Sequence, residues 1–187
     1  MTLHPVLAPV LSDAHARTSE QVQAQRAAAQ RALAHCAELC HAPTGGWQKN
    51  ADNVPVPNEG FYWSVSHKRE WAAAVIADRP VGIDIEKIAP RRDELVMDEL
   101  ATAEEWAILG DRSWPSFFRL WTAKEATLKA NGVGIGKFAR CRLMRVPDDR
   151  HMELFFDDKA WRVEHYRHED HIVALTKSGA SIVWHTP

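Results

Sequence analysis

The segment RPVGIDIEKI, residues 79–88, alternates in the manner of a β-strand. Side chains of an extended chain point to opposite faces in turn. One face carries three branched apolar side chains, those of Val81, Ile83 and Ile85. The other carries Gly82, Asp84 and Glu86, whose carboxylates would stand roughly 6.5 Å apart along the strand. The segment therefore predicts a strand with a carboxylate pair that can converge on one hard cation. Gly82 leaves room beside that pair for a bulky neighbour, although a strand with a solvated polar face would show the same alternation.

A second informative segment is FFRLWTAKEATLKANGVGIG, residues 117–136. Trp121, Glu125 and Lys129 are spaced by four, so a helix places them on one face. A Glu–Lys pair at this spacing is common on solvated helix surfaces, where it contributes only about 0.3–0.5 kcal/mol. The tryptophan on the same face and the glycines that follow favour a partly buried, functional face instead.

The order of predicted elements indicates an antiparallel α+β fold, arranged as two similar halves. Helices are expected at 19–41, capped by Thr18 or Ser19, at 102–109, which begins with a capping box, and from Ser113 to Asn131. Strands are expected at 61–66, 71–77 and 81–86, with a hairpin-like turn joining the last two. Further strands are expected in the runs 138–146, 152–156, 161–166, 172–176 and 181–185.

Composition argues against nucleic-acid-binding, membrane-spanning and secreted proteins. The chain has 187 residues with a formal net charge of −2, which gives no indication of a nucleic-acid partner. The longest apolar run, Trp71–Ala77, is too short to span a bilayer, and the N-terminus lacks a secretory pattern. Three cysteines do not form a disulfide framework, so a reducing, cytoplasmic setting is expected.

The candidate groups suit one chemistry when they are taken together. Three carboxylates, those of Asp84, Glu86 and Glu125, are the hard oxygen ligands that Mg²⁺ prefers. Lys129 and His67, the latter at the end of the first predicted strand, suit a substrate that carries phosphate. A metal, carboxylates and cations around a phosphate describe phosphoryl transfer.

These residues also carry a family resemblance. Gly82-Ile-Asp84-Ile-Glu86 is followed by Trp121-Thr-Ala-Lys124-Glu125-Ala-Thr-Leu-Lys129, with Ser66-His67 upstream and Gly132 and Gly134 downstream. This ordered set resembles the 4′-phosphopantetheinyl transferases of the surfactin-synthetase-activating (Sfp) type. Each motif alone is weak, whereas the ordered set over residues 60–136 is highly specific.

The resemblance implies a pseudo-dimer of two halves, residues 1–87 and 88–187, each a small antiparallel sheet packed with helices. It implies that coenzyme A and Mg²⁺, or Mn²⁺ in its place, bind in the cleft between the halves. The implied enzyme is a holo-[carrier protein] synthase. It would move 4′-phosphopantetheine from coenzyme A to a serine of an acyl- or peptidyl-carrier protein and release 3′,5′-ADP, in fatty acid, polyketide or nonribosomal peptide biosynthesis. A monomer is expected.

The resemblance also assigns roles to single residues. Asp84, Glu86 and Glu125 match the metal ligands, and Glu125 matches the group that activates the serine. Lys129 matches a lysine beside the pyrophosphate that serves the leaving group. Further expected coenzyme A contacts are Ser66, His67 and Lys124. The resemblance implies basic residues for the 3′-phosphate in the N-terminal half without fixing their positions, and the candidates there are Arg17, Arg26, Arg31 and Lys49, with Arg26 the first choice. Many relatives carry a Gly-Lys-Pro element that this chain lacks, and the two candidates to replace its lysine are Lys49 and backbone amides of the same loop.

Two other functions fit the same residues. The carboxylates could serve another Mg²⁺-dependent phosphoryl-transfer enzyme that acts on a different nucleotide. The chain could also be a non-catalytic member of the fold that binds carrier proteins, although the complete set of candidate catalytic residues disfavours this.

Overall fold

The computed structural model describes residues 2–13 and 16–187 and has a mixed α+β fold. The first half of the chain contributes β1 (Thr2–Leu3), β2 (Val6–Pro9), α1 (Thr18–Cys40), β3 (Tyr62–His67), β4 (Trp71–Ala77) and β5 (Ile83–Lys87). Three helices follow, α2 (Leu95–Leu100), α3 (Ala103–Leu109) and α4 (Trp114–Ala130), and then the short 3₁₀ helix η1 (Ile135–Arg140). The chain continues with β6 (Arg142–Asp148), β7 (His151–Phe156), β8 (Lys159–His168), β9 (His171–Thr176) and β10 (Ser181–Ile182).

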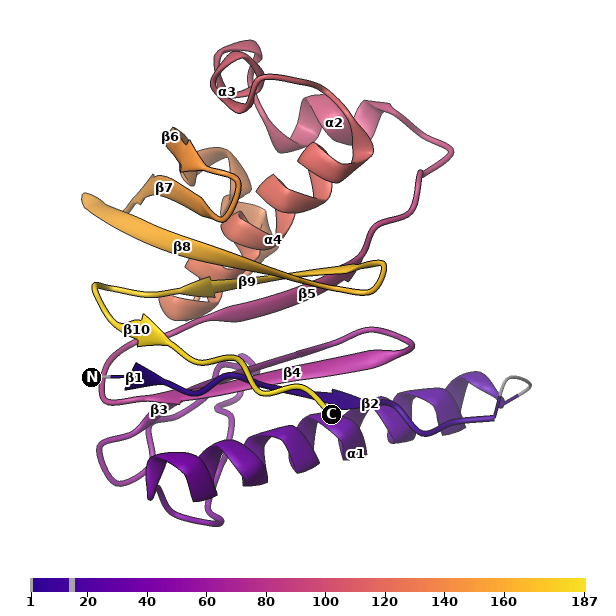
Figure 1. Ribbon diagram of the computed structural model, residues 1–187, viewed down its shortest axis with the longest axis vertical. Helices are drawn as coiled ribbons and strands as arrows, with labels where there is room; N and C mark the ends of the chain where they lie inside the picture. Colours follow the sequence, from indigo (N-terminus) through magenta and orange to yellow (C-terminus); the bar gives the residue numbers. More distant parts are fainter. Residues whose placement is uncertain (1, 14–15) are drawn as a thin grey trace.

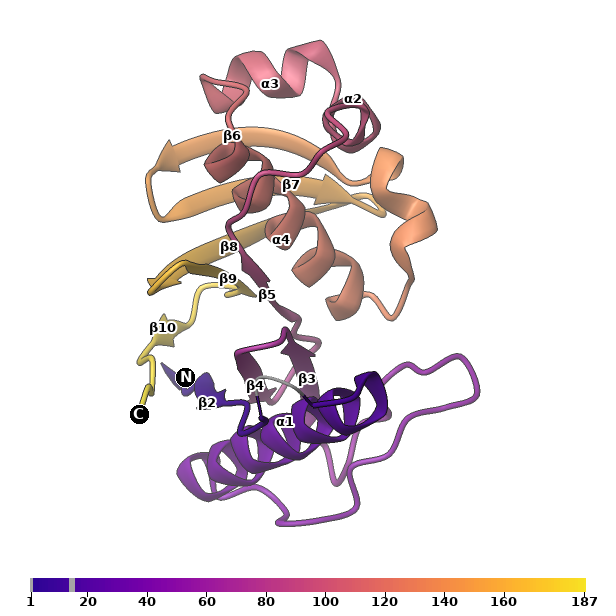
Figure 2. The ribbon, with the colours of Figure 1, turned by 90° about the vertical axis from the view of Figure 1, so that its right-hand side faces the viewer.

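Two antiparallel sheets form the body of the molecule, each with a long helix against it (Figures 1 and 2). The smaller sheet has the order β2-β4-β3 and packs on α1, and the larger has the order β5-β9-β8-β7-β6 and packs on α4. A short parallel pair, β1 and β10, joins the two ends of the chain. Within the described ranges, none of the helices combines the length and apolar character that crossing a bilayer requires.

Helix α4 confirms the helix predicted between Ser113 and Asn131. The Ser113 side chain accepts a hydrogen bond from the backbone N–H of Ser116 at 3.3 Å, which caps the first turn. Phe117, Leu120 and Leu128 are buried along the helix and fix its face against the larger sheet. The helix is therefore held rigidly, with its last turns beside β5.

Helix α1 is also confirmed, with a different start. Arg17 is its N-cap residue, and the Glu20 carboxylate accepts a hydrogen bond from the Arg17 backbone N–H at 2.9 Å. Thr18 and Ser19, the predicted caps, already belong to the helix. The buried stripe is mostly small: Ala28, Ala29, Ala32, Leu33, Cys36 and Ala37. Such side chains let the helix lie close to the smaller sheet.

The hairpin predicted between 71–77 and 81–86 is wrong. Strand β4 pairs with β2 and β3, whereas β5 pairs with β9 in the larger sheet, where Asp84 lies opposite Ala174. The chain thus leaves one sheet and enters the other through residues 78–82. Other differences are α2, β1 and β2, which were not predicted, and η1, which occupies the start of the predicted strand at 138–146.

The bulky neighbour of Gly82 is the backbone of α4. A Cβ atom on Gly82 would overlap the carbonyl oxygen of Ala126 and lie 2.8 Å from the backbone nitrogen of Ala130. Both obstacles are helix backbone, which cannot give way as a flexible side chain can. The absence of a side chain at Gly82 is therefore what allows α4 to approach β5.

This contact predicts that Gly82→Ala is strongly destabilising. The added methyl group must push α4 away from β5, and overpacking of this kind typically costs about 1–3 kcal/mol or more. Urea unfolding of the purified variant measures the loss. Gly136→Ala is the matched control, because a Cβ there meets nothing within 4 Å. Equal stability of the two variants would contradict this account of the packing.

Candidate active site

Asp84 is the centre of a buried polar cluster between β5 and α4. Its side chain is only 5% exposed, and its Oδ1 accepts hydrogen bonds from the Ser66 hydroxyl and the Lys129 ammonium, both at 2.7 Å. Its Oδ2 is buried and has no hydrogen-bond partner among the described residues. A buried carboxylate oxygen without a partner is costly, so this atom is suited to a ligand.

Glu86 shares the same face of β5 and is paired with a different cation. Its carboxylate lies 2.7 Å from the ammonium of Lys68, which follows the Ser66-His67 pair directly. Burial raises the pKa of Glu86, and the nearby charge of Asp84 raises it further, while Lys68 acts in the opposite direction. The two β5 carboxylates are therefore close enough to repel each other.

Glu125 brings a third carboxylate from α4. Burial is the main reason that its pKa is raised to about 7, and the charge of Asp84 adds to the effect, while Lys129 opposes it. A carboxyl group whose pKa lies near neutral pH exchanges protons readily under physiological conditions, which suits a general base.

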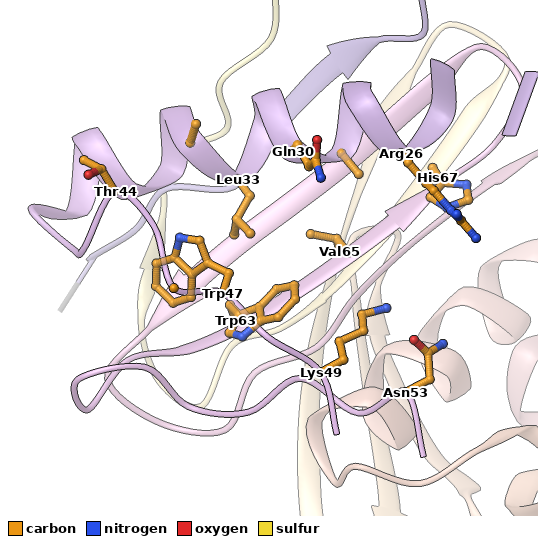
Figure 3. Close-up of a pocket in the computed structure, with 13 residues that line it drawn as sticks. Arg26, Gln30, Leu33, Thr44, Trp47, Lys49, Asn53, Trp63, Val65 and His67 are labelled. Carbon is orange, nitrogen blue, oxygen red and sulfur yellow. The ribbon is translucent and has the colours of Figure 1, made fainter. Parts of the chain in front are cut away.

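A cleft of about 730 Å³ opens between α1, β3 and the loop that follows α1 (Figure 3). Its lining includes two cationic side chains, Arg26 and Lys49, the imidazole of His67, and two tryptophans, Trp47 and Trp63. Figure 3 shows Arg26 descending from α1 toward His67, with Lys49 reaching into the cleft from the opposite side. The cleft thus offers positive charge and aromatic surface together.

The basic groups of the cleft and Lys129 influence one another electrostatically. Burial lowers the pKa of His67, followed by the charges of Lys129, Lys49, Lys68 and Arg26. Burial likewise lowers the pKa of Lys49, followed by Lys129 and Arg26. Lys129 also binds Asp84, so it connects the cationic cleft to the carboxylate cluster. Mutually repelling cations at one place favour the binding of an anion.

The carboxylates fit a magnesium ion. In the part of the chain that the structure describes, no three His, Cys, Asp or Glu side chains are arranged to hold a metal as they stand. Mg²⁺ does not need three, because it is usually held by one or two carboxylates together with waters and substrate phosphates. The unpartnered Asp84 Oδ2 and the nearby Glu125 supply that kind of donor set.

Two of the expected coenzyme A contacts are engaged away from the cleft, and a third is bound within the carboxylate cluster. The Lys124 ammonium is buried on another side of α4, where it pairs with Glu105 at 2.9 Å and donates to the carbonyl of Leu100. Arg31 donates to the carbonyl of Pro9 and is not part of the cleft lining. Ser66 donates to Asp84 and therefore positions a carboxylate.

Sequence reasoning did not single out Lys68, Trp47 or Trp63. Lys68 adjoins the Ser66-His67 pair and could have been found from that position alone. The sequence around the two tryptophans does not indicate that they line a cleft, because this depends on how the loop 41–61 folds back under α1. Their rings meet edge to face with centroids 6.0 Å apart.

Glu125 predicts a pH dependence of stability in metal-free protein. Its folded pKa of about 7 exceeds its ordinary value of 4.5, so between these pH values the folded protein holds a proton that the unfolded chain releases. The stabilisation is complete at low pH and is lost as pH rises toward 7. We expect the free energy of unfolding of Glu125→Gln to fall on the order of 2–3 kcal/mol less than that of wild type over this pH range. Urea unfolding across pH 4.5–8 measures it, with exposed Glu38→Gln as control. Parallel curves for wild type and Glu125→Gln would contradict the assignment.

Comparison with known proteins agrees with this geometry. The model of the 4'-phosphopantetheinyl transferase superfamily matches residues 80–176, which include β5, α4 and the larger sheet. The chain is 33% identical over 102 residues to the 4'-phosphopantetheinyl transferase psf-1 of Bacillus pumilus, covering 52% of this chain and 43% of that protein. It is 30% identical over 77 residues to 4'-phosphopantetheinyl transferase Sfp of Bacillus subtilis, covering 40% of this chain and 34% of that protein.

A human protein extends the similarity. The L-aminoadipate-semialdehyde dehydrogenase-phosphopantetheinyl transferase of Homo sapiens is 31% identical over 165 residues, covering 71% of this chain and 50% of that protein. The chain spans about half or less of the length of the curated relatives that it matches. With more than half of its residues matched by the family model, the chain belongs to the 4'-phosphopantetheinyl transferase superfamily.

Proposed function

We propose that this chain catalyses the Mg²⁺-dependent transfer of 4′-phosphopantetheine from coenzyme A to a serine of an apo acyl- or peptidyl-carrier protein, with release of 3′,5′-ADP. The observation that carries the proposal is the position of Lys129. This side chain pairs with Asp84, and its charge lowers the pKa values of His67 and Lys49 in the cleft, so we infer that a single substrate reaches both the carboxylates and the cleft.

The cleft is the proposed site for the nucleotide part of coenzyme A. Arg26 and Lys49 line it and supply positive charge for phosphate groups, and His67 supplies a ring N–H as a hydrogen-bond donor. Trp47 and Trp63 supply flat apolar surface for the base. Because Lys49 lines the cleft, it is our candidate to take the place of the missing Gly-Lys-Pro lysine. Arg31 and Lys124 are left out of this site because their charged groups are bound elsewhere.

Asp84, Glu86 and Glu125 are the proposed ligands of Mg²⁺, and Mn²⁺ has the same preference for oxygen. When bound, the ion supplies positive charge that offsets the charge of the pyrophosphate oxygens. Without it, Lys129 and Lys68 balance Asp84 and Glu86.

Two residues of the chain have separate roles in the proposed transfer. The serine oxygen forms a bond to the phosphorus that bears pantetheine, and the bond from that phosphorus to the bridging oxygen of 3′,5′-ADP breaks. Glu125, whose pKa is raised to about 7, accepts the proton that the serine loses. The Lys129 ammonium pairs with Asp84, a proposed metal ligand. In this proposal it offsets the negative charge that develops on the departing oxygen.

The architecture supports a division into two related halves, residues 1–87 and 88–187. Each half contains an antiparallel sheet covered by a long helix, α1 in the first and α4 in the second. Strand β5 belongs to the first half in sequence and to the larger sheet in space, so it joins the halves at the site. One chain supplies both the cleft and the carboxylates, which favours a monomer as the active unit.

Three free thiols fit a reducing, cytoplasmic setting.

A direct test follows the mass of the carrier. The chain is incubated with an apo-carrier protein, Mg²⁺ and coenzyme A, and intact-mass spectrometry should detect the addition of one phosphopantetheine group. We expect Asp84→Asn and Glu125→Gln to slow the reaction about 10²–10⁴-fold, because one loses a metal ligand and the other the base. Arg31→Ala should react like wild type. Absence of modified carrier, or turnover with ATP in place of coenzyme A, would contradict the proposal.

The cleft predicts how coenzyme A is distinguished from dephospho-coenzyme A. Loss of a charged hydrogen bond to the 3′-phosphate should cost about 1.5–3 kcal/mol, so Arg26→Ala and Lys49→Ala should raise KM for coenzyme A at least tenfold. KM for dephospho-coenzyme A should change little. Arg31→Ala is the matched control on the same helix. If both cleft variants discriminate between the two donors as well as wild type, the phosphate is bound elsewhere.

A further inference from the structure

Lys68 is a cation that acts on both the carboxylate cluster and the cleft. It directly follows β3, and its ammonium lies 2.7 Å from the Glu86 carboxylate. Burial lowers the pKa of His67, which lines the cleft (Figure 3), and the charge of Lys68 adds to that effect. Burial raises the pKa of Glu125, and the charge of Lys68 opposes that rise. Lys68 therefore lies within electrostatic reach of both parts of the candidate site.

The two lysines that pair with the β5 carboxylates are held differently. The Lys129 ammonium is bound twice, by the Asp84 carboxylate at 2.7 Å and by the carbonyl of Ile83 at 3.2 Å. Lys68 extends from the turn after β3, its side chain is 37% exposed, and among the described residues its ammonium has one partner, Glu86. A single ion pair with one solvent-accessible partner is weak. Lys68 is thus the lysine that can leave its carboxylate at lower cost.

The Lys68 ammonium occupies a carboxylate that a metal ion needs. In residues 2–13 and 16–187, no three carboxylates or similar ligands stand arranged to hold a metal, and the Glu86 carboxylate faces Lys68 instead. Two cations on one carboxylate repel each other, and more strongly in a partly buried site than in water. A divalent cation that binds Glu86 therefore competes with the Lys68 ammonium.

We propose that Lys68 is an exchangeable counter-ion: it holds Glu86 in the metal-free protein, Mg²⁺ displaces it, and its ammonium then pairs with a phosphate of the substrate in the cleft. The identities of the metal and of the substrate rest on the proposed function. The position of Lys68 beside His67 brings the released ammonium to the lining of the cleft. The substrate takes up the cation that competes with the metal, so each ligand strengthens the binding of the other.

Binding of Mn²⁺ tests the exchange without any turnover. The electron paramagnetic resonance signal of free Mn²⁺ is followed as purified protein is titrated, with no carrier protein present. We expect Lys68→Gln to bind Mn²⁺ at least about fivefold more tightly than wild type, because the competing ammonium is gone. Lys68→Arg, which keeps the charge, should bind like wild type. Mn²⁺ should also raise Tm more in Lys68→Gln than in wild type.

Lys87→Gln is the matched control. Lys87 is adjacent to Glu86 in sequence but points to the other face of β5, where it pairs with Glu70 and Asp170. Its loss removes the same charge without freeing a carboxylate of the cluster, so Mn²⁺ affinity should change less than about twofold at physiological salt. Equal gains in Lys68→Gln and Lys87→Gln would reduce the effect to net charge and overturn the proposal. Mn²⁺ binding by Lys68→Gln that is no tighter than that of wild type would also overturn it.

Coenzyme A tests the transfer of the ammonium to a phosphate. Saturating coenzyme A should raise Mn²⁺ affinity more in wild type than in Lys68→Gln, because the variant has no ammonium to transfer. An equal rise in both proteins would overturn this step. The metal titration needs no turnover, so its outcome is separate from that of the carrier-modification assay.

Discussion

The ion pair between Lys129 and Asp84 is the contact on which the site depends. Removing two charges from water is expensive unless they are paired and further hydrogen-bonded. Here the Lys129 ammonium contacts both the Asp84 carboxylate, at 2.7 Å, and the carbonyl of Ile83, while Ser66 donates to the same carboxylate. The pair therefore fastens α4 to β5 and to β3 at once, and it can form only because Gly82 lets the helix approach.

Several other polar groups around this ion pair are unpaired or have shifted pKa values. Asp84 Oδ2 has no partner among the described residues, Glu125 has a raised pKa, and Lys49 and His67 have lowered pKa values. Each of these features works against the stability of the folded protein. A fold selected for stability alone would pair or remove such groups, and their accumulation at one place is typical of a functional site. The proposed ligands, a phosphate-bearing substrate and a hard cation, would neutralise these charges together.

Local signals predicted the helices well and the pairing of strands poorly. The capping residues Thr102 and Ser113 fix where α3 and α4 begin, and these signals lie within a few residues of the elements that they define. Strand β5 shows the opposite case. Its alternation identified a strand, but its partner β9 lies almost ninety residues away in the chain, beyond the reach of a turn signal such as that at 78–80. The chain crosses between the sheets at residues 78–82, where the sequence indicates a hairpin, because β5 pairs with β9 and packs against α4.

Lys124 and Lys129 show how far a motif can specify a site. Both belong to the segment that carries the resemblance: Lys124 directly precedes Glu125, and Lys129 follows it by four positions. Five residues on a helix correspond to a rotation of about 140°, so the two ammonium groups cannot serve one face. Lys129 shares the face of Glu125 and reaches Asp84, whereas Lys124 turns into the interior and pairs with Glu105, whose other oxygen accepts from the N–H of Thr102. Lys124 thus ties α4 to the start of α3. A motif therefore records structural and functional constraints together. Glu125 and Lys129, four positions apart, belong to the candidate site, whereas Lys124 supports the helix that carries them and Trp121 packs against Phe117 and Phe138.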